Sequence, residues 1–272
     1  LATKQPSMTA ASRAGKIKSF TEKNDSKEIV EEVTTAARSQ FIAVVGNIGT
    51  AMPVGFIFAY AYAWIVGSPL FSADYALHNF HSFDPLQSPT IVLAALTGVY
   101  LWASSIVAGW FENWMVYRRI PEAIANHRTF CELFGAKKME RISKWFLKNA
   151  AGFGGNISLG ILLGFSPAIG KFFGIPMDVR HVTLTSASIM MSAASFGETQ
   201  FPWTDFGRAL IGLFCIGILN FGVSFFLALS VAARARNAAP GWFTKLSMAM
   251  AGHFLRHPTH FFFPPARKAH EK

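Results

Sequence analysis

Residues 209–233 read ALIGLFCIGILNFGVSFFLALSVAA and carry no charge, although Arg208 and Arg234 flank them directly. A helix of about 20 predominantly apolar residues is long enough to cross the hydrocarbon core of a bilayer. This segment is therefore predicted to span a membrane as a single helix, and it decides the fold class.

Three further stretches without charge point the same way. We expect spans at about 41–66 and 90–110, within uncharged runs at 39–73 and 85–111, and a third span at 149–170. The fold class is therefore predicted to be all-α, a polytopic transmembrane helix bundle with about four full spans.

The composition supports a membrane protein. The chain is 51% hydrophobic, contains 27 Phe and is only 15% charged, whereas soluble domains carry about 25% charged residues. The two cysteines, Cys131 and Cys215, have no zinc-type spacing, and we predict no disulfide between a basic loop and an apolar span.

The positions of the basic residues predict the topology. The formal net charge is +10, and the Lys and Arg residues gather in the segment before the first span, in the 112–148 loop and after residue 233, whereas 68–85 has none. Positively charged loops stay on the cytoplasmic side. We therefore expect an inner-membrane protein with both ends in the cytoplasm and 68–85 outside.

A shorter uncharged run at 181–197 is rich in Ser and Thr and conflicts with a five-span model. A fifth crossing would place the basic tail outside. We interpret this run as a partial or re-entrant span, which is tolerated where protein or a water-filled cavity surrounds it.

The chain divides into three predicted parts. These are a cytoplasmic N-terminal segment at 1–38, the transmembrane bundle at 39–233 and a basic amphipathic tail at 234–272, with a helix lying on the inner leaflet. The chain begins at Leu1 without a signal peptide, so we interpret it as the later part of a longer protein.

Several motifs carry a resemblance to a known family. They are LATKQPSMTA (1–10), VVGNIGTAMPVGF (44–56), HNFHSFDPLQS (78–88), IVAGWFENW (106–114) with YRRIP (117–121), DVRHVTLTSAS (178–188) and NFGVSFFLALSVAARAR (220–236). Together they resemble the bacterial integral-membrane family described as site-specific recombinase, also called Gcr-like. The resemblance implies that this region is the C-terminal membrane part of such a protein.

The chemistry of DNA recombination finds little support in the residues. His253-Phe254-Leu255-Arg256 matches a His-x-x-Arg pattern, but all five tyrosines precede it, whereas a tyrosine recombinase has its nucleophile downstream. The basic residues follow the cytoplasmic loops, as membrane insertion alone requires. We expect no direct DNA binding, although the family name keeps recombination open as an alternative.

An acidic and histidine-rich segment, FSADYALHNFHSFDP (71–85), is a candidate metal site. If 72–83 is helical, Asp74, His78 and His81 share one face, and Asp84 ends the helix before Pro85. Imidazole and carboxylate ligands suit zinc, copper or iron. The alternative is an interfacial helix with these side chains at headgroup level.

Two further polar sets lie in or beside the spans. Arg180 and His181 stand at one end of the Ser/Thr-rich run, and Glu198 and Asp205 at the other, so this run can line a substrate path or simply anchor its ends. Asn47, Asn156 and Asn220 lie inside predicted spans and line a polar interior or join helices by hydrogen bonds.

Three functions remain open from these patterns. The first is transport or lipid handling through a polar cavity, and the second is a membrane metalloprotein or metalloenzyme. The third is a component of a larger membrane complex, with another membrane protein or a second copy as partner. The bilayer itself is the one partner that every reading requires.

Overall fold

The computed structural model describes residues 27–197, 200–235, 237 and 241–264. Within these ranges the chain is helical and has no strand. Four helices are long and apolar enough to cross a membrane: α2 (Lys27–Val66), α4 (Thr90–Tyr117), α7 (Ala136–Phe173) and α9 (Trp203–Ala235). The predicted fold class is confirmed.

The partial span is the short helix α8 (Val182–Ser195), with 14 residues. At 1.5 Å per residue it is about 21 Å long, which is less than the roughly 30 Å of a hydrocarbon core. Helix α3 (Ala73–Phe83) occupies the acidic and histidine-rich segment, capped by the side chain of Ser72 and ended at Asp84.

Much of the 112–148 loop is helical, which the charge pattern did not predict. Helix α4 continues to Tyr117, and α5 (Ile120–Ala125) and α6 (Arg128–Phe134) precede α7. Lys and Glu are good helix formers, and Lys144 pairs with Glu140 one turn away at 2.6 Å. The charged residues of this region therefore do not end its helices.

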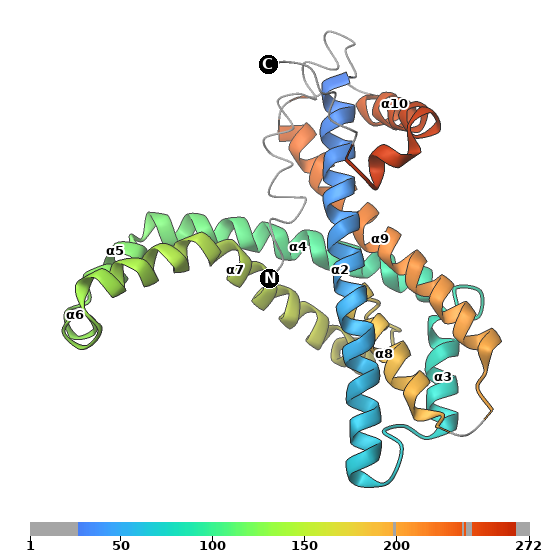
Figure 1. The fold of residues 1–272 in the computed structure, drawn as a ribbon. Coiled ribbons are helices and arrows are strands. Elements are labelled where there is room, and N and C mark those ends of the chain that lie inside the picture. The colour runs from blue at the N-terminus through green and yellow to red at the C-terminus, as the bar shows by residue number, and fades with distance from the viewer. Residues whose placement is uncertain (1–26, 198–199, 236, 238–240, 265–272) are drawn as a thin grey trace, which may run out of the picture.

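The long helices are not parallel. Figure 1 shows α4 and α7 side by side and running across α2. Helix α9 runs obliquely to both α2 and this pair. Helix α2 packs mainly on α8, whereas α4 packs on both α7 and α9. Residues of α2, α4, α7, α8 and α9 line a cavity between these diverging helices.

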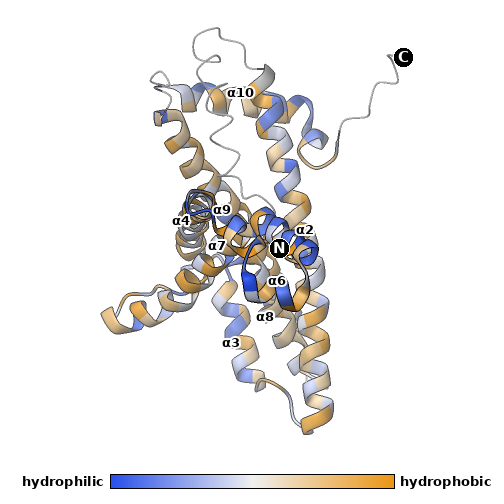
Figure 2. Ribbon diagram, turned by 90° about the vertical axis from the view of Figure 1, so that its left-hand side faces the viewer, coloured by the Kyte–Doolittle hydropathy of each residue, from blue (hydrophilic) through white to orange (hydrophobic). Residues whose placement is uncertain are grey.

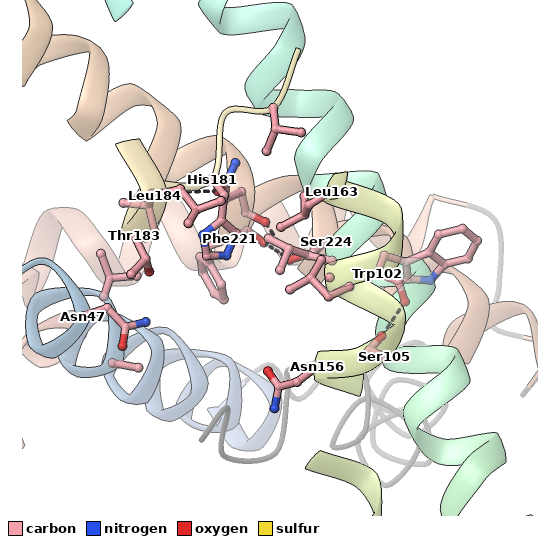
Figure 3. Close-up of a pocket in the computed structure, with 18 of the residues that line it drawn as sticks. Asn47, Trp102, Ser105, Asn156, Leu163, His181, Thr183, Leu184, Phe221 and Ser224 are labelled. Carbon is pink, nitrogen blue, oxygen red and sulfur yellow. Dashed lines mark hydrogen bonds between the residues drawn. The ribbon is translucent and has the colours of Figure 1, made fainter. Parts of the chain in front are cut away.

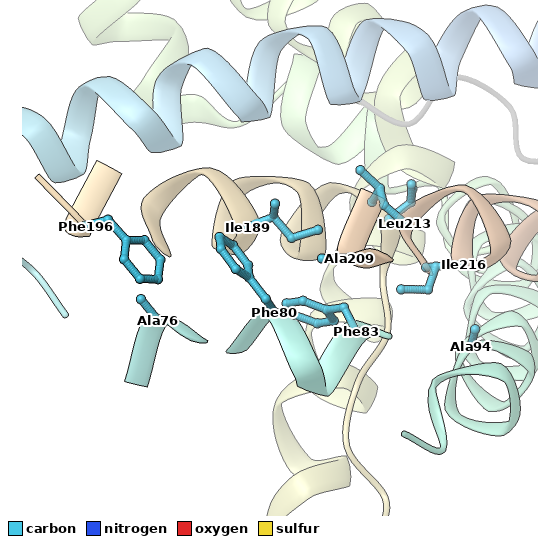
Figure 4. Close-up of a cluster of buried hydrophobic side chains, with 10 residues drawn as sticks. Ala76, Phe80, Phe83, Ala94, Ile189, Phe196, Ala209, Leu213 and Ile216 are labelled. Carbon is cyan, nitrogen blue, oxygen red and sulfur yellow. The ribbon is translucent and has the colours of Figure 1, made fainter. Parts of the chain in front are cut away.

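The main core joins α3, α8 and α9 (Figure 4). Phe80 of α3 is fully buried between the rings of Phe196 and Phe206, with centroids 5.7 Å away in both cases. Gly212 of α9 meets the carbonyl oxygen of Phe83 so closely that a Cβ atom would overlap it. The short helices are thus held firmly against α9.

A second core lies where α2 begins and α9 ends. Ile29 and Val33 of α2 pack with Leu229 and Ala233 of α9 and with Leu246 of α10 (Trp242–Arg256). The 3₁₀ helix η1 (Pro258–Phe261) follows α10 and packs on α2. Figures 1 and 2 both show α10 lying across the axis of α2, as expected for a helix at a membrane surface.

Candidate functional site

A large cavity lies between the diverging helices and has a volume of about 1240 Å³. Its walls come from α2, α4, α7, α8 and α9, so all four candidate spans contribute. Ligand pockets for drug-sized molecules measure roughly 300–1,000 Å³. The cavity is therefore large enough for a ligand of lipid size.

Most of the lining is apolar or glycine. Leu101, Leu163 and Phe221 supply hydrophobic wall, while Gly160 and Gly164 of α7 have open space where a side chain would begin. Earlier in the same helix, Gly154 and Gly155 instead lie in close contact with α4. The glycines of α7 thus allow close helix packing in one part of the helix and border the cavity in another.

A few polar side chains project into this apolar space (Figure 3). Asn47 comes from α2, Asn156 from α7 and Thr183 from α8, with His181 at the start of α8. Asn47 has no side-chain hydrogen bond to the described residues, and Asn156 donates only to the carbonyl oxygen of Gly152 in its own helix, at 2.8 Å.

His181 contributes an unsatisfied atom to the cavity wall. Its Nδ1 atom is buried and has no hydrogen-bond partner among the described residues. A buried polar atom without a partner costs about 1–3 kcal/mol, so such an atom is commonly explained by something that binds there. His181 and Asn47 are thus among the lining groups with hydrogen-bonding capacity to spare.

Asn220 also borders the cavity but is used for structure. Its Oδ1 atom accepts from the backbone N–H of Val182 at 3.1 Å, and its Nδ2 atom donates to the carbonyl oxygens of Ala94 and Arg180 at 3.0 Å each. These three bonds join α9 to α4 and to the start of α8.

Arg180 lies behind the cavity wall and is only 6% exposed. Its guanidinium donates to Asp178 at 2.6 Å, to Thr90 at 3.2 Å and to the carbonyl oxygen of Ser82 at 3.1 Å. Its carbon Cζ lies 4.9 Å from the ring centroid of Phe83. Arg180 thus connects α3 and α4 to the segment before α8.

The residues predicted as metal ligands do not converge on one point. His81 Nε2 lies 3.1 Å from Asp205 Oδ1 of α9, while Asp84 is buried with Arg208 at 3.8 Å. Asp74 and His78 lie exposed on α3. In the described ranges no three His, Cys, Asp or Glu side chains are arranged to hold a metal.

Metal binding by Asp74, His78, His81 and Asp84 therefore stays a prediction, and it requires His81 to leave Asp205. Glu198, the remaining residue of the predicted outer mouth, lies outside the described residues. Asp205, which was grouped with Arg180 and His181, lies instead with His81.

Sequence reasoning missed Asn79, which directly follows His78 in α3. Its Nδ2 atom donates to the hydroxyls of Ser188 and Ser192 at 2.7 Å each. These serines belong to the Ser/Thr-rich helix α8, so part of its polarity serves helix packing. The only signal in the sequence was an amide on the same helix face as apolar residues.

Comparison with known proteins gives one family. The family model described as site-specific recombinase matches residues 1–264. The chain belongs to this family. No curated protein and no solved structure gives a significant match.

Membership agrees with the resemblance carried by the motifs and covers the candidate spans together with α10. Every helix that lines the cavity lies inside the matched region. The cavity therefore lies entirely within the part of this chain that the family model matches.

Proposed function

We propose that this member of the site-specific recombinase family binds a lipid-like amphipathic molecule in the cavity, as part of lipid handling or transport. The observation that carries the proposal is the joint placement of Asn47, Asn156 and His181 around one apolar space. Apolar walls with a few unengaged polar groups are typical of sites for such ligands.

The polar groups define what the ligand must offer. An amide at Asn47 supplies both donor and acceptor, and an imidazole nitrogen at His181 takes either role according to its tautomer. A ligand with one or two hydroxyl, ester or amide groups on a long apolar body would satisfy both. A purely hydrocarbon ligand would leave His181 Nδ1 unpaired.

The setting of this proposal is a bacterial inner membrane with both chain ends in the cytoplasm, of the Gcr-like type. The basic residues support it, since they gather in the segment before α2, in the α4–α7 connection and beyond α9. DNA recombination gains no support, because all five tyrosines precede His253 and Arg256 in the chain.

The test compares two tryptophan variants on neighbouring positions of α7. Gly160 lines the cavity and has open space beside it, whereas Ile161 is 54% exposed and is not part of the lining. Gly160→Trp should fill the cavity, while Ile161→Trp places the same side chain on the outer surface of the helix.

The readout is lipid retained per chain after extensive detergent exchange, identified by mass spectrometry. We expect Gly160→Trp to retain about fivefold less lipid than the wild type, and Ile161→Trp to match the wild type. Equal retention in all three proteins, each monodisperse by size exclusion, would contradict binding in the cavity.

A further inference from the structure

Three histidines gather at the membrane-surface end of the bundle, away from the cavity. His253 lies in the last turn of α10, His257 follows it, and His260 belongs to η1. Their ring centroids are 5.3 Å, 5.5 Å and 4.8 Å apart, and the rings of His257 and His260 are nearly parallel. Three imidazoles thus share one small volume.

The surroundings of this cluster are positive. Burial lowers the pKa of His253, and the positive charges of His257, His260 and Arg256 lower it further. None of the three rings forms a hydrogen bond or ion pair with a described residue. Without a nearby anion, a proton therefore binds to His253 less readily than to a free histidine.

Charged side chains also lie on the helices that pack near the cluster. Helix α2, which packs on η1 and α10, carries Glu31, Glu32 and Arg38, and α9 carries Arg234. Helix α10 adds Lys245. None of these is among the charges that act on His253.

A metal does not suit this arrangement as it stands. In the portion of the chain that the structure describes, no three potential ligands are placed to hold a metal ion. Protons are the alternative positive ligands of imidazole near neutral pH. A protonated cluster beside Arg256 then requires an anion, and phosphate oxygens accept strong hydrogen bonds from imidazolium and guanidinium groups.

Exposed apolar side chains around the cluster indicate where that phosphate comes from. Leu255 is 83% exposed and Phe263 is 66% exposed, with Phe254 at 45%. Side chains of this kind beside basic groups insert at the boundary between headgroups and acyl chains. The three imidazoles would then lie at the level of lipid phosphates.

We propose that His253, His257 and His260 form a proton-dependent site for the phosphate group of an anionic phospholipid. Phosphate binding and protonation favour each other, because each supplies the charge that the other needs. The affinity of the protein for the anionic phospholipid should therefore rise as the pH falls below neutral. It should level off once the three imidazole rings are protonated in the free protein. The proposal is independent of what the cavity binds.

The experiment uses the full chain in phosphatidylcholine nanodiscs that contain a small fraction of dansyl-labelled lipid. Trp242 at the start of α10 is the donor for energy transfer, and subtraction of the Trp242→Phe signal isolates it. We expect the apparent affinity for dansyl-phosphatidylglycerol to increase about fivefold between about pH 7.5 and about pH 5.5. Dansyl-phosphatidylcholine should show no increase.

Variants separate the cluster from a general effect of pH. His253→Gln/His257→Gln/His260→Gln should remove the increase, while His127→Gln, on an exposed histidine before α6, should keep it. Retention of the increase in the triple variant, or an equal increase with dansyl-phosphatidylcholine, would overturn the proposal.

A second variant, which should gain signal, keeps the test valid if the triple variant fails to fold. His257 is exposed, and His257→Lys fixes one positive charge there, so its phosphatidylglycerol signal at about pH 7.5 should exceed that of the wild type. A weaker signal with an intact circular dichroism spectrum would contradict the proposal. Inorganic phosphate should not displace the lipid more than chloride at equal ionic strength does, and specific displacement would identify a free-phosphate site instead.

Discussion

The side-chain amide of Asn220 donates a hydrogen bond to the main-chain carbonyl oxygen of Arg180, with 3.0 Å between nitrogen and oxygen. The two residues are 40 positions apart, and both are buried. One polar side chain in an apolar helix thereby fixes the backbone at the entrance to the partial span. Several consequences can be measured.

Asn220→Leu should destabilise the protein by about 2 kcal/mol, because the backbone groups of Val182, Ala94 and Arg180 lose their partner. Thermal unfolding in detergent measures the change. Asn156→Leu is the matched control, since that amide bonds only within its own helix, and it should shift stability by less than about 0.5 kcal/mol. Similar losses in both variants would contradict a joining role for Asn220.

Arg180→Met should cost about 3 kcal/mol of stability, because it leaves Asp178 without its cation and removes the link from α3 and α4. Denaturant titration in detergent provides the value. Arg128→Met removes the same charge from an ion pair whose arginine side chain is 92% exposed, and it should be nearly neutral. A neutral Arg180→Met would show that the network is not needed for folding.

Gly212→Ala should weaken the attachment of α3 to α9, because the new methyl group would overlap the carbonyl oxygen of Phe83. We expect a loss of about 2 kcal/mol in thermal or denaturant unfolding. Gly207→Ala lies on the same helix with open space beside it, and it should stabilise the helix by about 0.5–1 kcal/mol. If Gly212→Ala stabilised the protein as Gly207→Ala is expected to, the close contact between Gly212 and Phe83 would be ruled out.

The histidine cluster should make α10 sensitive to pH in uncharged detergent. A histidine whose pKa is below its ordinary value of 6.5 in the folded protein resists protonation there, so its contribution to stability is present above about pH 6.5 and is lost as the pH falls through the lowered pKa. Limited proteolysis near α10 should therefore accelerate under acidic conditions. His253→Gln should reduce this acceleration, and an unchanged acceleration would exclude His253 as its cause.

Much of the architecture could be predicted from the chain alone. Each uncharged run longer than about 20 residues became a long helix, because a bilayer offers no partners for irregular backbone. The short Ser/Thr-rich run became α8, too short to cross. Helix α3 and its end at Asp84 also follow from local spacing and the Pro85 that comes next.

The roles of the candidate site residues depended on long-range contacts, which local sequence patterns do not reveal. His81 pairs with a residue 124 positions away, so its spacing from Asp74 and His78 said nothing about its partner. The three asparagines of the predicted spans looked equivalent, and all three border the cavity, yet only the amide of Asn220 bonds to other helices and segments. Only packing assigned them different roles.

The sequence by itself determined that this protein has four helices long and apolar enough to cross a membrane and one shorter apolar helix, because long runs without charge are stable in hydrocarbon only as helices. The tertiary structure decided which polar groups remain unsatisfied. The divergence of α2 from the α4–α7 pair opens the cavity, and it leaves Asn47 and His181 without partners. A hydrogen bond needs two groups within about 3 Å, and only the packed helices determine which groups come that close.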